Sequence, residues 1–123
     1  MKIPAFLLRR LYLKGSFTST TSGFEFQIRN ALGSGYARRL LPLTLDGSEL
    51  DMAITTFEID GKVMSFEAVS NDTPFTLAMN KTTTIAYSSG VMTEGYHKIG
   101  MRFEVAGLGE LGFDFSDTAS ANG

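Results

Sequence analysis

The stretch that decides the fold reads KIGMRFEVAGLGELGFDFS and spans residues 98–116. Large apolar residues take every second position in its two halves, first from Ile99 to Val105 and again from Leu111 to Phe115. A β-strand turns successive side chains to opposite faces of a sheet, whereas a helix with about 3.6 residues per turn would scatter them around its circumference. A glycine-rich turn separates the halves. The stretch therefore predicts a β-hairpin with one buried face.

The same period of two recurs upstream at residues 24–29, where large apolar and polar residues alternate. Two Asp-Gly pairs, Asp46-Gly47 and Asp60-Gly61, predict turns, because Asp and Gly accept the positive φ of a type I′ turn. Other runs rich in Thr, Phe, Tyr or Leu, which favour strands, lie at 11–18, 75–79 and 82–88. With about nine strands spaced by turn signals, we expect an all-β fold, a single-domain antiparallel β-sandwich or barrel.

The two ends of the chain carry different signals. The segment from Pro4 to Arg10 suggests one short N-terminal helix, since Pro suits the first helical position. The residues expected to share one face of this helix are Ile3, Phe6, Leu7 and Leu11. Residues 117–123 are small and polar, so we expect a flexible tail there. No repeat or linker divides the chain, which predicts one β domain over residues 1–123.

Composition limits where the protein is expected to act. The chain has 123 residues, a common size for one domain, and contains no cysteine. The absence of disulfides is typical of a reducing compartment. The apolar run at 3–8 is too short for a signal peptide, and no stretch approaches the roughly 20 apolar residues that cross a bilayer. We therefore expect a cytoplasmic protein without a membrane span.

Charge is distributed unevenly along the chain. Residues 1–45 contain seven basic groups and one acidic group, whereas residues 46–123 contain four basic and twelve acidic groups. If distant strands interleave, these charges mix in space. Otherwise, a basic face could bind a small anion or the acidic face of a second copy, which favours a homo-oligomer, most simply a homodimer. The net charge of −2 and the lack of tryptophan disfavour binding to nucleic acid.

His97 is the candidate catalytic residue, because it is the single histidine of the chain. A general base needs a group that orients it, usually a carboxylate, and Glu94 is close in sequence. The alternative is a histidine that only satisfies hydrogen bonds at the start of a strand. One histidine without cysteine does not supply a zinc site, and no nucleotide-binding motif is present. We expect neither a metal nor a cofactor.

Two arginine pairs are the candidates for ligand binding. Neighbouring residues on a strand face opposite sides, so neither pair is expected to form one patch if it is extended. One arginine of each pair could still bind an anion or a carboxylate, and the candidates are Arg10, Arg38 and Arg39. The alternative is solvated guanidinium groups on packed aliphatic stems.

The opening of the chain resembles a known group of proteins. The segments KIPAFLL (2–8), LYLKGS (11–16) and GFEF (23–26), with Asn30, are similar to short microbial proteins, some of which carry the name hydroxymethylglutaryl-CoA reductase. The resemblance covers roughly the first 30 residues. That reductase needs a nicotinamide site with a catalytic Glu, Lys, Asp and His. No segment here matches those motifs, so the resemblance implies no site residue.

Three functions remain open. The first is a non-catalytic binding or interaction module, for which we expect a solid core and an exposed apolar face. The second is a β-barrel that binds a small apolar or anionic ligand, for which we expect a large closed pocket lined by Phe and Met. The third is a small enzyme, for which we expect a cleft where His97 is hydrogen-bonded to an acid.

Overall fold

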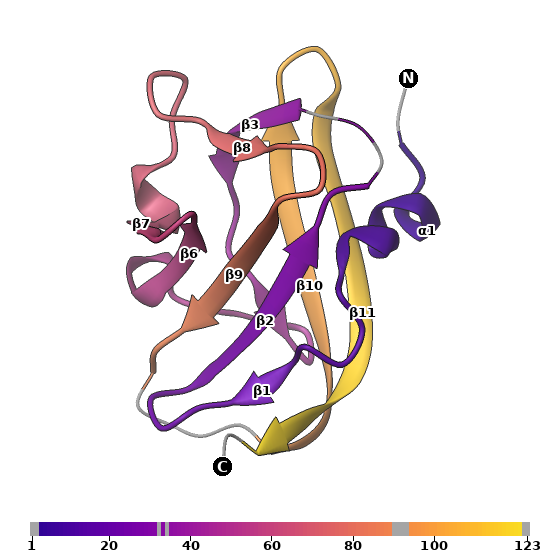
Figure 1. Ribbon diagram of the computed structural model, residues 1–123, viewed down its shortest axis with the longest axis vertical. Helices are drawn as coiled ribbons and strands as arrows, with labels where there is room; N and C mark the ends of the chain where they lie inside the picture. Colours follow the sequence, from indigo (N-terminus) through magenta and orange to yellow (C-terminus); the bar gives the residue numbers. More distant parts are fainter. Residues whose placement is uncertain (1–2, 32, 34, 90–93, 122–123) are drawn as a thin grey trace.

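The computed structural model describes residues 3–31, 33, 35–89 and 94–121. Most of them lie in strands, which form one curled, mixed sheet shaped as a half-barrel (Figure 1). One short helix, α1 (Ala5–Leu8), precedes the sheet and continues into a 3₁₀ turn, Arg9–Leu11. Two more 3₁₀ turns lie at Met52–Ile54 and Phe66–Ala68. The prediction of an all-β fold with one short N-terminal helix is confirmed.

Eleven strands lie within the described residues: β1 (Thr18–Ser19), β2 (Phe24–Arg29), β3 (Gly35–Leu40), β4 (Thr44–Leu45), β5 (Ser48–Glu49), β6 (Thr55–Ile59), β7 (Lys62–Ser65), β8 (Phe75–Leu77), β9 (Thr82–Tyr87), β10 (Gly95–Val105) and β11 (Gly109–Ala121). Nine follow the order β5-β4-β10-β11-β1-β2-β9-β6-β7, while β3 pairs with β10 and β8 beside this path. The described pairs are antiparallel, except that β1 runs parallel to β11. The sheet is therefore mixed, because the first strand lies beside the last.

The hairpin predicted from the period-two stretch is β10 and β11. Its inward residues face one another across the two strands, as in Met101 opposite Phe113 and Phe103 opposite Leu111, and all four side chains are at most 5% exposed. The two Asp-Gly turns are also present. Asp60 and Asp46 have φ values of 52° and 51°, and they join β6 to β7 and β4 to β5.

The segment expected to be a flexible tail begins within the last strand. Residues 117–121 continue β11, where Asp117 lies opposite His97 on one side and Ser120 lies opposite Thr18 on the other. The backbone N–H of Ser120 also donates to the carbonyl of Phe17 at 3.0 Å. Small polar side chains do not prevent a strand when backbone partners are present on both sides. Residues 122–123 lie outside the described residues.

The N-terminal segment folds back onto the core instead of standing clear of it. Leu8 and Leu11 are 3% and 2% exposed, whereas Phe6 is 66% exposed. The face expected for this helix is thus wrong at Phe6. The chain tightens into a 3₁₀ turn after Leu8, and residues three apart share one side of such a turn. Leu8 and Leu11 therefore point inward together.

The described helices are all short. None of them has the length and the apolar character required to cross a membrane.

Candidate functional site

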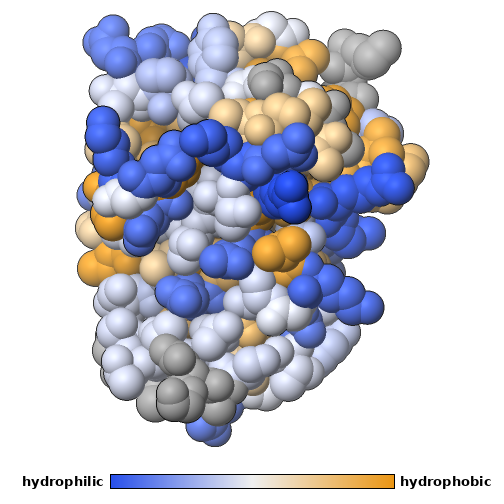
Figure 2. Space-filling model, in the orientation of Figure 1, coloured by the Kyte–Doolittle hydropathy of each residue, from blue (hydrophilic) through white to orange (hydrophobic). Residues whose placement is uncertain are grey.

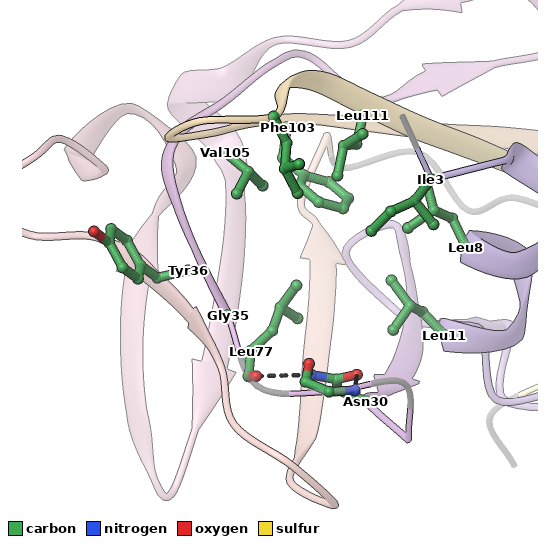
Figure 3. A pocket seen from close by; sticks show the side chains of 12 residues that line it. Ile3, Leu8, Leu11, Asn30, Gly35, Tyr36, Leu77, Phe103, Val105 and Leu111 are labelled. Carbon is green, nitrogen blue, oxygen red and sulfur yellow. Dashed lines mark hydrogen bonds between the residues drawn. The ribbon is translucent and has the colours of Figure 1, made fainter. Parts of the chain in front are cut away.

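An apolar pocket of about 120 Å³ opens at one end of the half-barrel, and we refer to it as the mouth pocket (Figure 3). One wall comes from the N-terminal segment, a second from the β10–β11 hairpin and a third from β3 and β8. The side chains that line these walls are Ile3, Leu8, Leu11, Tyr36, Leu77, Phe103, Val105, Leu108 and Leu111. Three elements far apart in the sequence thus enclose one apolar hollow.

Asn30 supplies the buried polar side chain among the lining residues and is 3% exposed. Its amide nitrogen donates to the carbonyl oxygens of Gly33 at 2.5 Å and Leu77 at 2.8 Å (Figure 3). Its side-chain oxygen accepts from the N–H of Gly33 at 3.3 Å. A buried polar group that is satisfied in this way holds the surrounding loops in place. Asn30 therefore joins the 30–33 loop to β8.

The size of the mouth pocket limits its occupant. Pockets for drug-sized ligands measure about 300–1,000 Å³, whereas an engineered cavity of about 150 Å³ holds a benzene molecule. The mouth pocket therefore suits one ring or one branched side chain. Two large apolar residues at this end remain exposed, Phe6 at 66% and Tyr36 at 52%. Figure 2 shows apolar surface beside charged surface on the side where α1 lies.

His97 lies near the start of β10, roughly 25 Å of strand from the mouth pocket. Its Nδ1 is 2.6 Å from Oδ2 of Asp46, and its Nε2 is 2.6 Å from the carbonyl oxygen of Glu94. The expected carboxylate is thus present, but it comes from Asp46 and not from the Glu94 side chain. Carbonyl and carboxylate oxygens can only accept, so both ring nitrogens donate.

The electrostatics of the pair follow from this geometry. The hydrogen bond that His97 donates to the Asp46 carboxylate raises the pKa of His97 above its ordinary value. The N–H of Lys98, 2.9 Å from Oδ1 of Asp46, and then His97 lower the pKa of the Asp46 carboxyl. The arrangement favours an imidazolium held between two acceptors. Such a ring has no free lone pair with which to take a proton from a substrate.

Arg38 and Arg39 lie together on the outer face of β3. The pairing with β10 shifts register between Glu104 and Val105 and leaves Arg38 without a counterpart. Arg38 donates from Nε and Nη2 to Oε1 of Glu104 at 2.9 and 2.5 Å, and Nε of Arg39 is 3.8 Å from Oε2. The prediction that adjacent arginines face opposite sides is therefore wrong for this pair. The β-bulge inserts one extra residue and turns both side chains outward.

The other arginine pair lies in the 3₁₀ turn, beside the mouth pocket. Arg9 donates from Nε to the carbonyl of Asp114 at 2.6 Å, on the open edge of β11. Arg10 is exposed and has no hydrogen bond or ion pair with another described residue. The predicted site residues thus lie in three places: Arg10 at the mouth, Arg38 and Arg39 on β3, and His97 at the far end of β10.

Tyr12 and Asp117 form a contact that sequence analysis missed, and we refer to it as the Tyr12 clasp. The Tyr12 hydroxyl donates to Oδ2 of Asp117 at 2.7 Å and accepts from the N–H of Phe17 at 3.2 Å, while the ring stacks on Phe115. Burial and Asp117 raise the pKa of Tyr12 to about 12, and the hydroxyl lowers the pKa of Asp117. A half-buried tyrosine needs a hydrogen-bond partner for its hydroxyl, and this requirement was the signal in the sequence that could have predicted the contact.

In the part of the chain that the structure describes, no three His, Cys, Asp or Glu side chains converge as ligands for a metal ion.

Two comparisons with known proteins are informative. No curated protein matches the chain. A family model with the description hydroxymethylglutaryl-CoA reductase, N-terminal domain, matches residues 7–120, which extends the similarity far beyond the opening segments. The matched range contains β1 to β10 and all of β11 except its last residue, Ala121. It also contains every residue that lines the mouth pocket except Ile3. The chain therefore belongs to the family described as hydroxymethylglutaryl-CoA reductase, N-terminal domain.

Proposed function

We propose that the chain is a non-catalytic interaction module that works as a homodimer, with Phe6 of each copy inserted in the mouth pocket of the other. One observation carries this proposal. An apolar pocket of about 120 Å³ lies beside a phenylalanine that is 66% exposed, on the segment that forms one wall of the pocket. Protein interfaces are commonly anchored by an aromatic side chain that fills such a pocket.

The placement of Phe6 fits a two-fold assembly. In a two-fold dimer the same surface patch of each copy faces the other, so a patch must be complementary to itself. The N-terminal segment carries both the exposed ring of Phe6 and, a few residues further along, Leu8 and Leu11, which line the hollow. One rotation can therefore satisfy both copies with identical contacts.

Charge at the rim supports the same arrangement. Arg10 precedes Leu11, and Glu110 precedes Leu111, so a basic and an acidic residue are next to lining residues in the sequence. Glu110 lies near the turn of the hairpin, on its outer face opposite Glu104. Arg10 and Glu110 are exposed, and neither forms an ion pair with another described residue. In the proposed dimer Arg10 of one copy faces Glu110 of the other. Complementary rim charges of this kind set partner choice and register more than affinity.

The two other functions have less support. The mouth pocket is smaller than a site for a drug-sized ligand, and the core around it is solid, with twenty buried apolar residues in one cluster. An enzyme that uses His97 would need a free ring nitrogen, yet Asp46 and the Glu94 carbonyl engage both. The family description names a domain of a reductase. Because no segment of the chain matches the catalytic motifs of that reductase, we do not propose that the chain catalyses a reduction.

Light scattering after size-exclusion chromatography tests the homodimer. At about 100 μM, well above a micromolar dissociation constant, the full-length chain should elute at twice its monomer mass of 13.4 kDa. Phe6→Asp should give a monomer with an unchanged circular dichroism spectrum. The matched control is Val63→Asp, which changes a residue that is 59% exposed on β7 and should remain a dimer. A monomeric wild-type chain, or a dimeric Phe6→Asp variant, would contradict the proposal.

A charge exchange tests the geometry of the dimer. Arg10→Glu and Glu110→Arg should each weaken the dimer, because each variant places like charges opposite one another. The double variant should regain most of the wild-type affinity in sedimentation equilibrium. If both single variants weaken the dimer and the double variant does not recover, the two residues do not face each other.

A further inference from the structure

We propose that Arg39, beside the bulge in β3, binds a carboxylate group. The bulge brings two guanidinium groups to one acid, because Arg38 and Arg39 both turn outward toward Glu104. β-Bulges are frequent where a sheet must redirect a side chain, and here the redirected side chain is a second cation. This inference does not depend on the proposed homodimer, since neither Phe6 nor the mouth pocket takes part in it.

The two arginines are not equivalent. Arg38 forms a close pair with Oε1 of Glu104 through two of its nitrogens. Arg39 lies 3.8 Å from Oε2, beyond hydrogen-bond distance, and its side chain is 62% exposed. Within the described residues Arg39 has no hydrogen-bond partner, although a guanidinium carries five N–H donors in a planar fork. Its donors are therefore available to a ligand.

Open hollows lie on both sides of Arg39, and Val69 lines both of them. One hollow, of about 310 Å³, is polar, and Ser70, Asn71 and Glu104 line it together with the two arginines. The other, of about 390 Å³, is lined mostly by apolar side chains, including Met52 and Phe66. Each falls within the range of about 300–1,000 Å³ that small-molecule sites occupy. Arg39 thus lies between a polar and an apolar compartment.

Charge selects the kind of anion and its position. Arg38 offsets the charge of Glu104, so Arg39 contributes one positive charge to the polar hollow, which a single carboxylate neutralises and a phosphate dianion exceeds. Glu110, opposite Glu104 on β11, does not line this hollow. Each hollow contains one glutamate. Glu104 in the polar hollow is paired with Arg38, whereas Glu67 in the apolar hollow has no ion pair with another described residue and would repel an anion there. The carboxylate is therefore expected in the polar hollow, between Arg39 and the Ser70–Asn71 turn, where a planar fork can bind it with two hydrogen bonds. An apolar body would extend over Val69.

The carboxylate could belong to a free organic acid or to an acidic side chain of a protein. Both sources present the same group to Arg39, so two probes distinguish them. Sodium benzoate represents a free acid with an apolar body. The α-amide of N-acetylglutamate represents an acidic side chain of a protein and has no apolar body. Tighter binding of benzoate assigns the site to an organic acid, and tighter binding of the glutamate derivative assigns it to a protein side chain.

Titration followed by ¹⁵N NMR tests the site. We expect saturable shifts of the Val69, Ser70 and Asn71 amide signals, with a dissociation constant of about 1 mM or below for the better probe. Arg39→Gln should weaken binding at least tenfold. The matched control is Arg29→Gln, an exposed arginine on β2 that has no ion pair with another described residue. That variant should bind as the wild type does.

A neutral probe completes the test. Benzamide has the shape of benzoate without its charge and should not saturate the site. The proposal is overturned if neither acid gives saturable shifts up to about 20 mM. It is equally overturned if Arg39→Gln binds as tightly as the wild type, or if benzamide binds as well as benzoate. Circular dichroism of each variant confirms that it is folded.

Discussion

The two ends of β10 differ in what their side chains leave unsatisfied. At its start, His97 is fixed by Asp46 and by the Glu94 carbonyl, so its polar atoms are fully used inside the chain. At its far end, Phe103 and Val105 line a pocket that the chain does not fill. The chemically reactive residue is thus engaged within the chain, whereas the end with ordinary apolar residues contains an unfilled pocket. The proposed function is therefore based on unfilled space and not on residue type.

The largest effect is expected at the mouth, from Phe103→Ala. Phe103 is 2% exposed and forms part of the pocket wall, so its truncation should lower the free energy of unfolding by about 3–5 kcal/mol. Urea denaturation measures this loss. The matched control, Phe6→Ala, removes the same ring from a site that is 66% exposed and should change monomer stability little. Similar losses in both variants would mean that the two rings are equally buried.

A smaller effect is expected at the Tyr12 clasp, which holds the N-terminal segment against β11. Tyr12→Phe keeps the stacked ring but removes the hydroxyl, which leaves Asp117 and the N–H of Phe17 without that partner. The loss in unfolding free energy should be about 1–2 kcal/mol, as for one hydrogen bond to a charged group. Hydrogen exchange should quicken at residues 12–17. Unchanged protection there would show that the clasp does not hold the segment.

The smallest effect is a pH dependence confined to the His97 end. The pKa of His97 is raised on folding. Its contribution to the free energy of unfolding is therefore complete below about pH 6.5 and is lost as the pH rises through the pKa of the folded state. The pKa of Asp46 is lowered, so its contribution is complete above about pH 4 and is lost in more acidic solution. Stability from this pair should therefore be greatest between these limits.

Urea denaturation at acidic and alkaline pH checks this dependence. The wild-type chain should lose more stability than His97→Gln when the pH rises from about 5.5 to 8.5, because the variant lacks the titrating ring. Leu77→Ala, at the mouth, should lower stability equally at both values, since a leucine does not titrate. An equal pH dependence in wild type and His97→Gln would show that the pair of His97 and Asp46 does not cause the change in stability.

Local patterns predicted much of the fold. The alternation in 98–116 and the two Asp-Gly turns depend on residues adjacent in the sequence, and the structure contains all of them. The hydrogen-bond partner of His97 could not be predicted from such local patterns. Asp46 lies 51 residues away and reaches the histidine only because β4 pairs with β10. Contacts between distant residues follow from strand order, which a period of two does not encode.

The candidate sites show the same limit. The sequence indicated Arg38 and Arg39, but it predicted that they diverge, because an extra residue in β3 leaves no signature in the alternation of neighbours. The mouth pocket was not predicted, since it is the space left between three separate elements. Exposure of Phe6 also escaped prediction, because the change from an α-helical to a 3₁₀ turn occurs within one turn.

The position of β11 has a consequence for the order of folding. This strand occurs last in the described chain, yet it lies between β10 and β1 and joins the two halves of the sheet. During synthesis, the half that contains β1, β2, β9, β6 and β7 must wait for residues 109–121 before it can be connected to the rest. Folding that depends on such distant pairings is slow, commonly milliseconds to seconds. In the interval, the edge of β1 that later receives β11 is open to pairing with other chains.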